Sequence, residues 1–98
     1  MSRQGTVTVL IEIHAADGHE QAARDALLHA IQTSEKPGLI NSTEYEDLDD
    51  PGAFYAVQVW ETMNDFHAHM RDAAENGMGE AIQVLREHPK TAVLRTIG

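Results

Sequence analysis

Two histidines, a tryptophan and a glutamine are the residues of this chain whose types and spacing could do chemistry. His67 and His69 lie two positions apart, and Gln58 and Trp60 precede them. An imidazole can move a proton near pH 7. An indole can stack on a planar ligand, or it can fill a core with its N–H bonded to a backbone carbonyl. Both interpretations stay open at this point: a role at a pocket, or a place in the core or at its boundary.

The spacing of the histidines argues against a metal site. Residues two apart on a helix point about 200° away from each other, so His67 and His69 could not converge on one ion from a helix. The other four histidines are scattered without the spacing of metal ligands: His14, His19, His29 and His88. We therefore expect no metal.

Gln58 places a polar group where a core should be apolar. In the segment 53–61, AFYAVQVWE, alternation puts Gln58 on one face with Phe54, Ala56 and Trp60. A buried amide has to find a hydrogen-bond partner, which favours a lined cavity over a solid core. No phosphate-binding loop, nucleophile elbow or paired-carboxylate signature stands out in the chain. The functions that remain possible for these residues are catalysis without a cofactor and the binding of a ligand.

Alternating and helical hydrophobic patterns predict the elements that position these residues. Strands are expected over 6–14, 39–48, 53–61 and 90–97, and helices from 19 to about 35 and from 64 or 65 onward. Asn64 or Asp65 is expected to cap the second helix. Its apolar stripe comprises Phe66, Met70, Ala73 and Ala74, and that of a shorter helix after it comprises Met78, Ala81, Ile82 and Leu85.

This element order predicts an α+β fold, a ferredoxin-like βαββαβ sandwich with a four-stranded antiparallel sheet. Right-handed crossovers place both helices on one face of the sheet. The strand at 39–48 is more polar and is expected at an edge. Tyr55, Val57 and Val59 would then lie on the open face, where a monomer would expose an apolar patch. We therefore expect a homodimer whose two sheets pack face to face.

Composition limits the class of protein and its partners. The chain has 98 residues, with 16 acidic against 7 basic side chains and a net charge of −9. Such a field repels phosphate backbones, so nucleic acid is not an expected partner. The apolar runs are too short for a membrane span, and the first residues do not resemble a signal peptide. With no cysteine, thiolate catalysis and cysteine-held metals are excluded, and a cytoplasmic location is the expectation.

The middle of the chain carries a recognisable pattern. Between Glu35 and Met70 it reads EKPGLINSTEYEDLDDPGAFYAVQVWETMNDFHAHM. Pro37–Gly38 ends a helix, Asp50–Pro51 forms an acidic turn, and a strand ends at Trp60, with His69 nine residues later. In this order and spacing the stretch resembles the antibiotic biosynthesis monooxygenase (ABM) family.

The resemblance implies a single ABM-like domain over residues 1–98 that forms a dimeric α/β barrel with a pocket in each subunit. It further implies a cofactor-independent monooxygenase that uses O₂ on an aromatic phenol, a quinol or a polyketide-like small molecule, without flavin, metal or haem. Catalytic roles would fall to His69, Trp60 and Gln58. The substrate-binding residues would be Phe54, Ala56, Phe66, Met70 and Tyr45.

The sequence also departs from the family pattern. Ala56 stands where anthrone-oxidising relatives carry an asparagine, and Gln58 where a glutamate is common. Met78 stands where haem-degrading relatives carry a histidine, which disfavours haem degradation. Two alternatives to the monooxygenase therefore stay open: a non-catalytic small-molecule binding dimer, or an isomerase that uses His69 as its acid and base.

Overall fold

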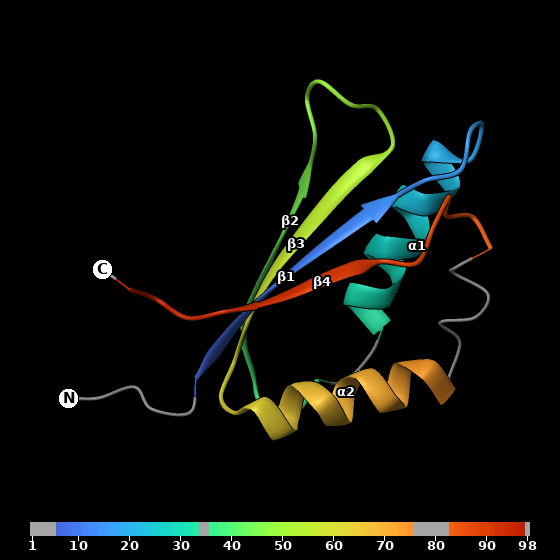
Figure 1. Cartoon of the computed structure of the whole chain (residues 1–98). Helices are drawn as coiled ribbons and strands as arrows, with labels where there is room; N and C mark the ends of the chain where they lie inside the picture. Colours follow the sequence, from blue (N-terminus) through green and yellow to red (C-terminus); the bar gives the residue numbers. More distant parts are fainter. Residues whose placement is uncertain (1–5, 34–35, 76–82, 98) are drawn as a thin grey trace.

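Six elements make up the part of the chain that the computed structural model describes, residues 6–33, 36–75 and 83–97. They follow the predicted βαββαβ order of the ferredoxin-like arrangement. The elements are β1 (Val7–His14), α1 (Glu20–Thr33), β2 (Leu39–Glu46), β3 (Ala53–Trp60), α2 (Met63–Glu75) and β4 (Lys90–Leu94) (Figure 1).

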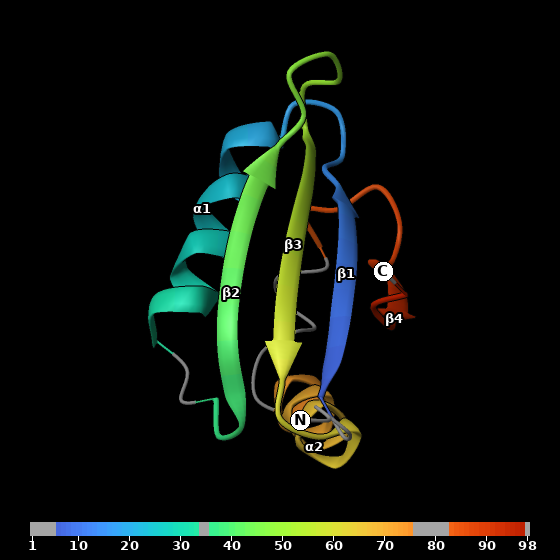
Figure 2. The same cartoon turned by 90° about the vertical axis from the view of Figure 1, so that its left-hand side faces the viewer.

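The four strands form one antiparallel sheet in the order β2-β3-β1-β4 (Figure 2). The β-branched strand β1 and the apolar strand β3 occupy the centre, and the more polar β2 lies at an edge, as predicted. Both helices lie on the same side of the sheet, and no other described helix or strand covers the opposite side (Figures 1 and 2). The predicted fold class, an α+β ferredoxin-like sandwich, is confirmed.

The strand register assigns residues to the two faces of the sheet. Val9 lies opposite Gln58 and Val7 opposite Trp60, so these side chains share the face that the helices cover. The core on this face has two clusters. Val9, Trp60 and Phe66 form the one at α2, and Ala15, Ala23 and Phe54 form the one at α1.

The open face is apolar at one end only. Leu10, Val57 and Val59 are half-buried there, and Leu94 extends the patch on β4 with 44% of its surface exposed. The neighbouring row across the sheet is polar or aromatic in every strand: Lys90, Glu12, Tyr55 and Tyr45. The open face is therefore less uniformly apolar than the sequence alternation indicates.

Hydrogen bonds fix the polar end of this face. The His14 ring donates to Glu12, and this bond lowers the pKa of the Glu12 carboxyl. The Tyr55 hydroxyl donates to Asp47 over 3.0 Å. Asp47 also accepts the backbone N–H of Asp49, and together these bonds lower its pKa.

Three predicted strands end earlier than expected. Strand β3 ends at Trp60 rather than at Glu61. Strand β2 ends at Glu46 rather than at Leu48, because the Asp47 carboxylate accepts two backbone N–H groups beyond it and turns the chain. Strand β4 ends at Leu94 rather than at Ile97, because Leu94 already pairs with Thr8 near the start of β1.

Two predictions about the helices are also wrong in detail. Thr62 caps α2, rather than Asn64 or Asp65: its Oγ1 accepts the Asp65 N–H at 3.0 Å and donates to the Asp65 carboxylate at 2.9 Å. Leu85 does not belong to a short helix, because it forms a β-bridge with Ala15. The remaining stripe residues of that helix, Met78, Ala81 and Ile82, lie outside the described residues, as do the side chains of Ala73 and Ala74.

No helix among the described residues is long and apolar enough to cross a membrane.

The loop before β2 depends on Gly38, which holds φ at +86°. A Cβ at this position would collide with the Asp65 carboxyl group, whereas a Cβ at Gly18, with φ at +82°, would meet open space. Gly38→Ala should therefore lower the free energy of unfolding by about 2 kcal/mol or more, and Gly18→Ala by about 1 kcal/mol. Denaturant unfolding of the two variants checks this, and equal losses would contradict the predicted clash with Asp65.

Candidate functional site

Trp60, the last residue of β3, is fully buried in the core at α2. Its indole packs with Val9 from β1 and Phe66 from α2, the two aromatic ring centroids being 6.0 Å apart. The indole Nε1–H donates to the Gln58 side-chain oxygen over 3.1 Å. The N–H partner is thus a side chain rather than the backbone carbonyl considered from the sequence.

Gln58 is the polar side chain that is buried among the described residues of this face, with 6% of its surface exposed. Residues two apart on a strand point to the same side, so its amide lies beside the indole of Trp60. In the described part of the chain, no buried side-chain nitrogen or oxygen is left without a hydrogen-bond partner. The Gln58 side-chain oxygen therefore has its hydrogen-bond partner within the core, and its burial does not require a ligand.

The helix α2 brings His69 to the same indole. Its ring centroid lies 5.1 Å from that of Trp60, with 34° between the ring planes. Met70, the next residue, packs on the core that contains Trp60. His67 instead lies beside Phe66 at 5.8 Å, and its side chain is exposed. The two histidines therefore contact different rings, as the helical spacing predicts.

A hollow of about 340 Å³ opens beside His69. Its lining comes from the loop before β2 and from successive turns of α2: Pro37, Asp65, Ala68, His69 and Asp72. The pKa of His69 is lowered from its usual 6.5, first by burial and then by the positive charge of Lys36, against which Asp72 acts in the opposite direction. The imidazole is therefore neutral near pH 7 and can accept a proton from a group in the hollow.

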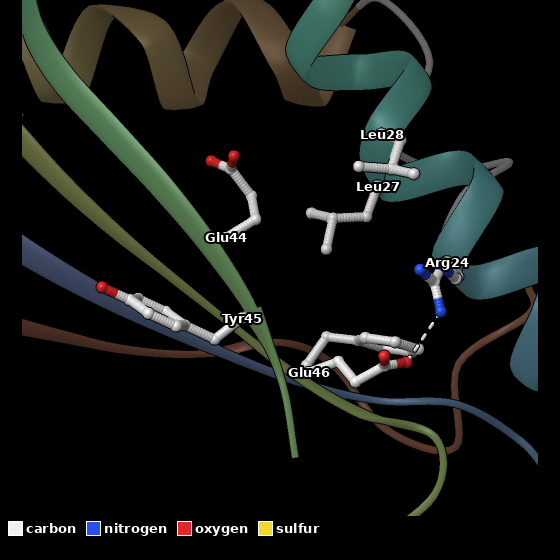
Figure 3. Close-up of a pocket in the computed structure, with 7 residues that line it drawn as sticks. Arg24, Leu27, Leu28, Glu44, Tyr45 and Glu46 are labelled. Atoms are coloured by element: carbon white, nitrogen blue, oxygen red, sulfur yellow. Dashed lines mark hydrogen bonds and ion pairs between the residues drawn. The ribbon is translucent and has the colours of Figure 1, made fainter. Parts of the chain in front are cut away.

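A second hollow, of about 180 Å³, lies between α1 and β2 (Figure 3). Leu27 and Leu28 line it from the helix, and Glu44 reaches into it from the strand. Arg24 closes one end through an ion pair with Glu46, at 2.9 Å. Phe54 and Tyr45 also line this hollow.

Residues 6–75 of the chain match the sequence profile of the antibiotic biosynthesis monooxygenase (ABM) family. The chain belongs to the ABM family.

Solved structures share the fold of this ABM protein at low sequence identity. PA3566 from Pseudomonas aeruginosa superimposes with a TM-score of 0.84 at 19% identity, over 100% of both chains. A conserved protein from Methanosarcina mazei Go1 superimposes with a TM-score of 0.81 at 15% identity, over 97% of this chain and 96% of that protein. A Deinococcus radiodurans protein provisionally named for the same family superimposes with a TM-score of 0.74 at 24% identity. The superposition covers 94% of this chain and 93% of that protein. A search of curated proteins finds no match to the chain.

The structure gathers most of the residues that the ABM resemblance implies, but not all. Five of these residues lie in or against the cluster at α2: Trp60, Gln58, Phe66, Met70 and His69. The other three substrate-binding candidates lie elsewhere. Phe54 is in the cluster at α1, and Ala56 is buried opposite Ile11 and Glu44. Tyr45 borders the second hollow from β2, but its ring points away from Leu27 and Leu28 (Figure 3).

Sequence reasoning missed the neighbours of His69 in this ABM protein. Asp65 and Asp72 lie four residues before and three residues after His69, a spacing that places all three on one side of a helix. This spacing of the two aspartates around His69 can be read from the sequence alone. Pro37 and Lys36 come from another element, so no local pattern could have placed them beside His69.

The lowered pKa of His69 has a measurable consequence. In an NMR titration the imidazole should titrate below 6.5, Lys36→Gln should raise its pKa and Asp72→Asn should lower it. Lys90→Gln, which removes the same charge on the open face, should leave this pKa unchanged. A His69 pKa at or above 6.5 would contradict the structure.

The same shift couples stability to pH. The unfolded chain binds the His69 proton more readily than the folded one, so the free energy of unfolding should fall as pH drops from about 6.5 towards the folded pKa. His69→Gln should remove this component, which denaturant unfolding between about pH 5 and pH 8 detects.

Proposed function

We propose that this ABM protein is a cofactor-independent monooxygenase that oxidises an aromatic phenol, a quinol or a polyketide-like small molecule with O₂. The observation that carries the proposal is His69, an imidazole with a lowered pKa, held against a buried indole at the edge of a hollow of about 340 Å³. Ligand pockets for small organic molecules usually span about 300–1,000 Å³. The family match supports the reaction class.

In the proposed reaction His69 accepts a proton from the phenol or from an acidic ring CH₂. The resulting phenolate or carbanion transfers electrons to O₂ and bonds to it through a ring carbon, and the peroxide anion takes the proton back from His69 to give a hydroperoxide. The hydroperoxide loses water and leaves a ring carbonyl, so one oxygen atom enters the product, the other leaves as water, and the substrate supplies all the electrons. The positive charge of Lys36, which already lowers the pKa of His69, would stabilise the substrate anion.

Trp60 and Gln58 enter this proposal as positioning residues rather than as groups that touch the substrate. Trp60 is fully buried and Gln58 nearly so, and they bond to each other. The Trp60 ring packs against the tilted His69 ring, so His69 has fewer orientations to lose when it accepts the proton. Phe66 and Met70 hold that indole in place from α2.

Oxygen consumption with a panel of anthrones and quinols tests the reaction. Purified protein should consume O₂ faster than the blank without protein, and His69→Gln should lower kcat by about 10²-fold or more, as expected for loss of a general base. His67→Gln is the matched control: its ring contacts Phe66 rather than Trp60, so it should leave kcat nearly unchanged.

Two other outcomes identify other functions. Ligand-dependent quenching of Trp60 fluorescence with no turnover across the panel would indicate a binding protein, which the unusual Ala56 and Gln58 favour. Product formation without O₂, lost in His69→Gln, would indicate an isomerase. Either result would overturn the proposal that the protein is a monooxygenase.

We propose that the open sheet face pairs two copies of the chain. Leu10, Val57 and Val59 form its apolar end, and Leu94 is 44% exposed beside them. On the other side of β4, Val93 is 46% exposed, so this strand presents apolar surface on both faces. A second copy packed on the sheet would remove the open-face surface from water.

Val57→Lys should break this contact. Burying an unpaired ammonium costs about 2 kcal/mol or more, so the dimer dissociation constant should rise by about thirtyfold or more. Light scattering over a dilution series measures this dissociation constant. Ala22→Lys, at an exposed position on α1, adds the same charge and should leave the dimer intact. If Val57→Lys and the native chain dimerise equally well, the open face is not the contact.

A further inference from the structure

The edge strand β2 presents an unusual set of side chains to the helices. Ser42, Glu44 and Glu46 lie opposite Gln58, Ala56 and Phe54, so all three point to the face that the helices cover. A strand with one face against helices normally places apolar residues there. In this chain that side of β2 carries two carboxylates, directly below α1.

These carboxylates border the hollow of about 180 Å³ between α1 and β2. Figure 3 shows Glu44 reaching from the strand towards the helix and Leu27 reaching into the same space from the helix. Leu28, 40% exposed, and the nearly buried Phe54 complete an apolar lining. The hollow therefore combines an apolar surface with a carboxylate at its border.

The charges around the hollow do not balance. Arg24 neutralises Glu46 through the ion pair at 2.9 Å. Glu44 accepts a hydrogen bond from the Ser42 hydroxyl, and it is in none of the ion pairs found among the described residues. One negative charge is thus left beside apolar surface, in a chain whose net charge of −9 attracts cations.

We propose that this hollow binds a small organic ammonium ion. Its charged group meets the Glu44 carboxylate, and its short apolar body lies against Leu27, Leu28 and Phe54. A volume of about 180 Å³ is below that of pockets for drug-sized ligands, which limits the ligand to the size of a simple arylalkylamine. None of the residues around His69 lines this hollow, so the proposal does not depend on the oxidation reaction.

The probe is 2-phenylethylamine, with 2-phenylethanol as the neutral analogue of the same shape. NMR shift titration of the full chain measures both, and the largest shifts should map to Leu27, Leu28 and Phe54. The amine should bind about fivefold more tightly than the alcohol, the ratio expected for a partly exposed ion pair. Glu44→Gln should bring the two dissociation constants together.

Two control variants keep the test specific. Asp49→Asn removes the same charge from the exposed turn before β3 and should preserve the preference for the amine. Leu28→Gln should weaken amine and alcohol alike, because it changes only the apolar lining. Equal binding of the two probes to the native chain would overturn the proposal, as would equal loss of preference in Glu44→Gln and Asp49→Asn.

Failure here is distinguishable from failure of the proposed oxidation. His69→Gln should bind the amine as the native chain does, whatever its O₂ consumption. If the amine instead shifts the signals of Ala68, His69 and Asp72 and loses affinity in His69→Gln, the ammonium site between α1 and β2 is wrong.

Discussion

The burial of the Trp60 indole is the interaction on which this architecture depends. The ring lies at the end of β3, contacts Val9 on β1 and Phe66 on α2, and so joins the centre of the sheet to the second helix. Removing a side chain of this size from water contributes on the order of 4–6 kcal/mol before conformational entropy is counted. Burial would be costly if the N–H had no partner, and Gln58 supplies one from the same strand face. The packing of the core and the orientation of His69 therefore have the same cause.

The sequence predicts the central strands and the fold class well because one pattern determines both. In β1 and β3 the alternation of apolar residues fixes which side chains meet the helices, and a register slip of one residue would expose all of them. The ends of elements follow from single hydrogen bonds instead. Thr62 caps α2 and Asp47 ends β2 through contacts that hydrophobic periodicity does not report. Leu85 has the spacing of a helical stripe, yet a tertiary contact with Ala15 places it in a bridge.

The candidate site was predictable to the extent that it is local in the chain. Trp60, Phe66, His69 and Met70 come together because a strand is followed at once by a helix whose stripe faces it. The basic residues that act at the two hollows come from separate elements. Lys36 acts on His69 from the loop before β2, and Arg24 reaches Glu46 across 22 positions of the sequence. Their positions follow from how α1 and β2 are placed, and no periodicity within either element contains that information.

Polar residues on the helix-covered side of β2 give a physical reason for the hollow between α1 and β2. A solid apolar layer under both helices would need apolar side chains on β2, but that strand offers Ser42, Glu44 and Glu46 to the helices. Carboxylates keep their hydration or find partners, so α1 cannot close tightly on β2, and a hollow bordered by carboxylates remains between them. At the other end of the same face the side chains of Val9, Trp60 and Phe66 form a buried cluster, and the His69 ring lies against it. Because side-chain chemistry differs along the helix-covered face, one small sheet carries both a buried aromatic cluster and a separate hollow bordered by charge.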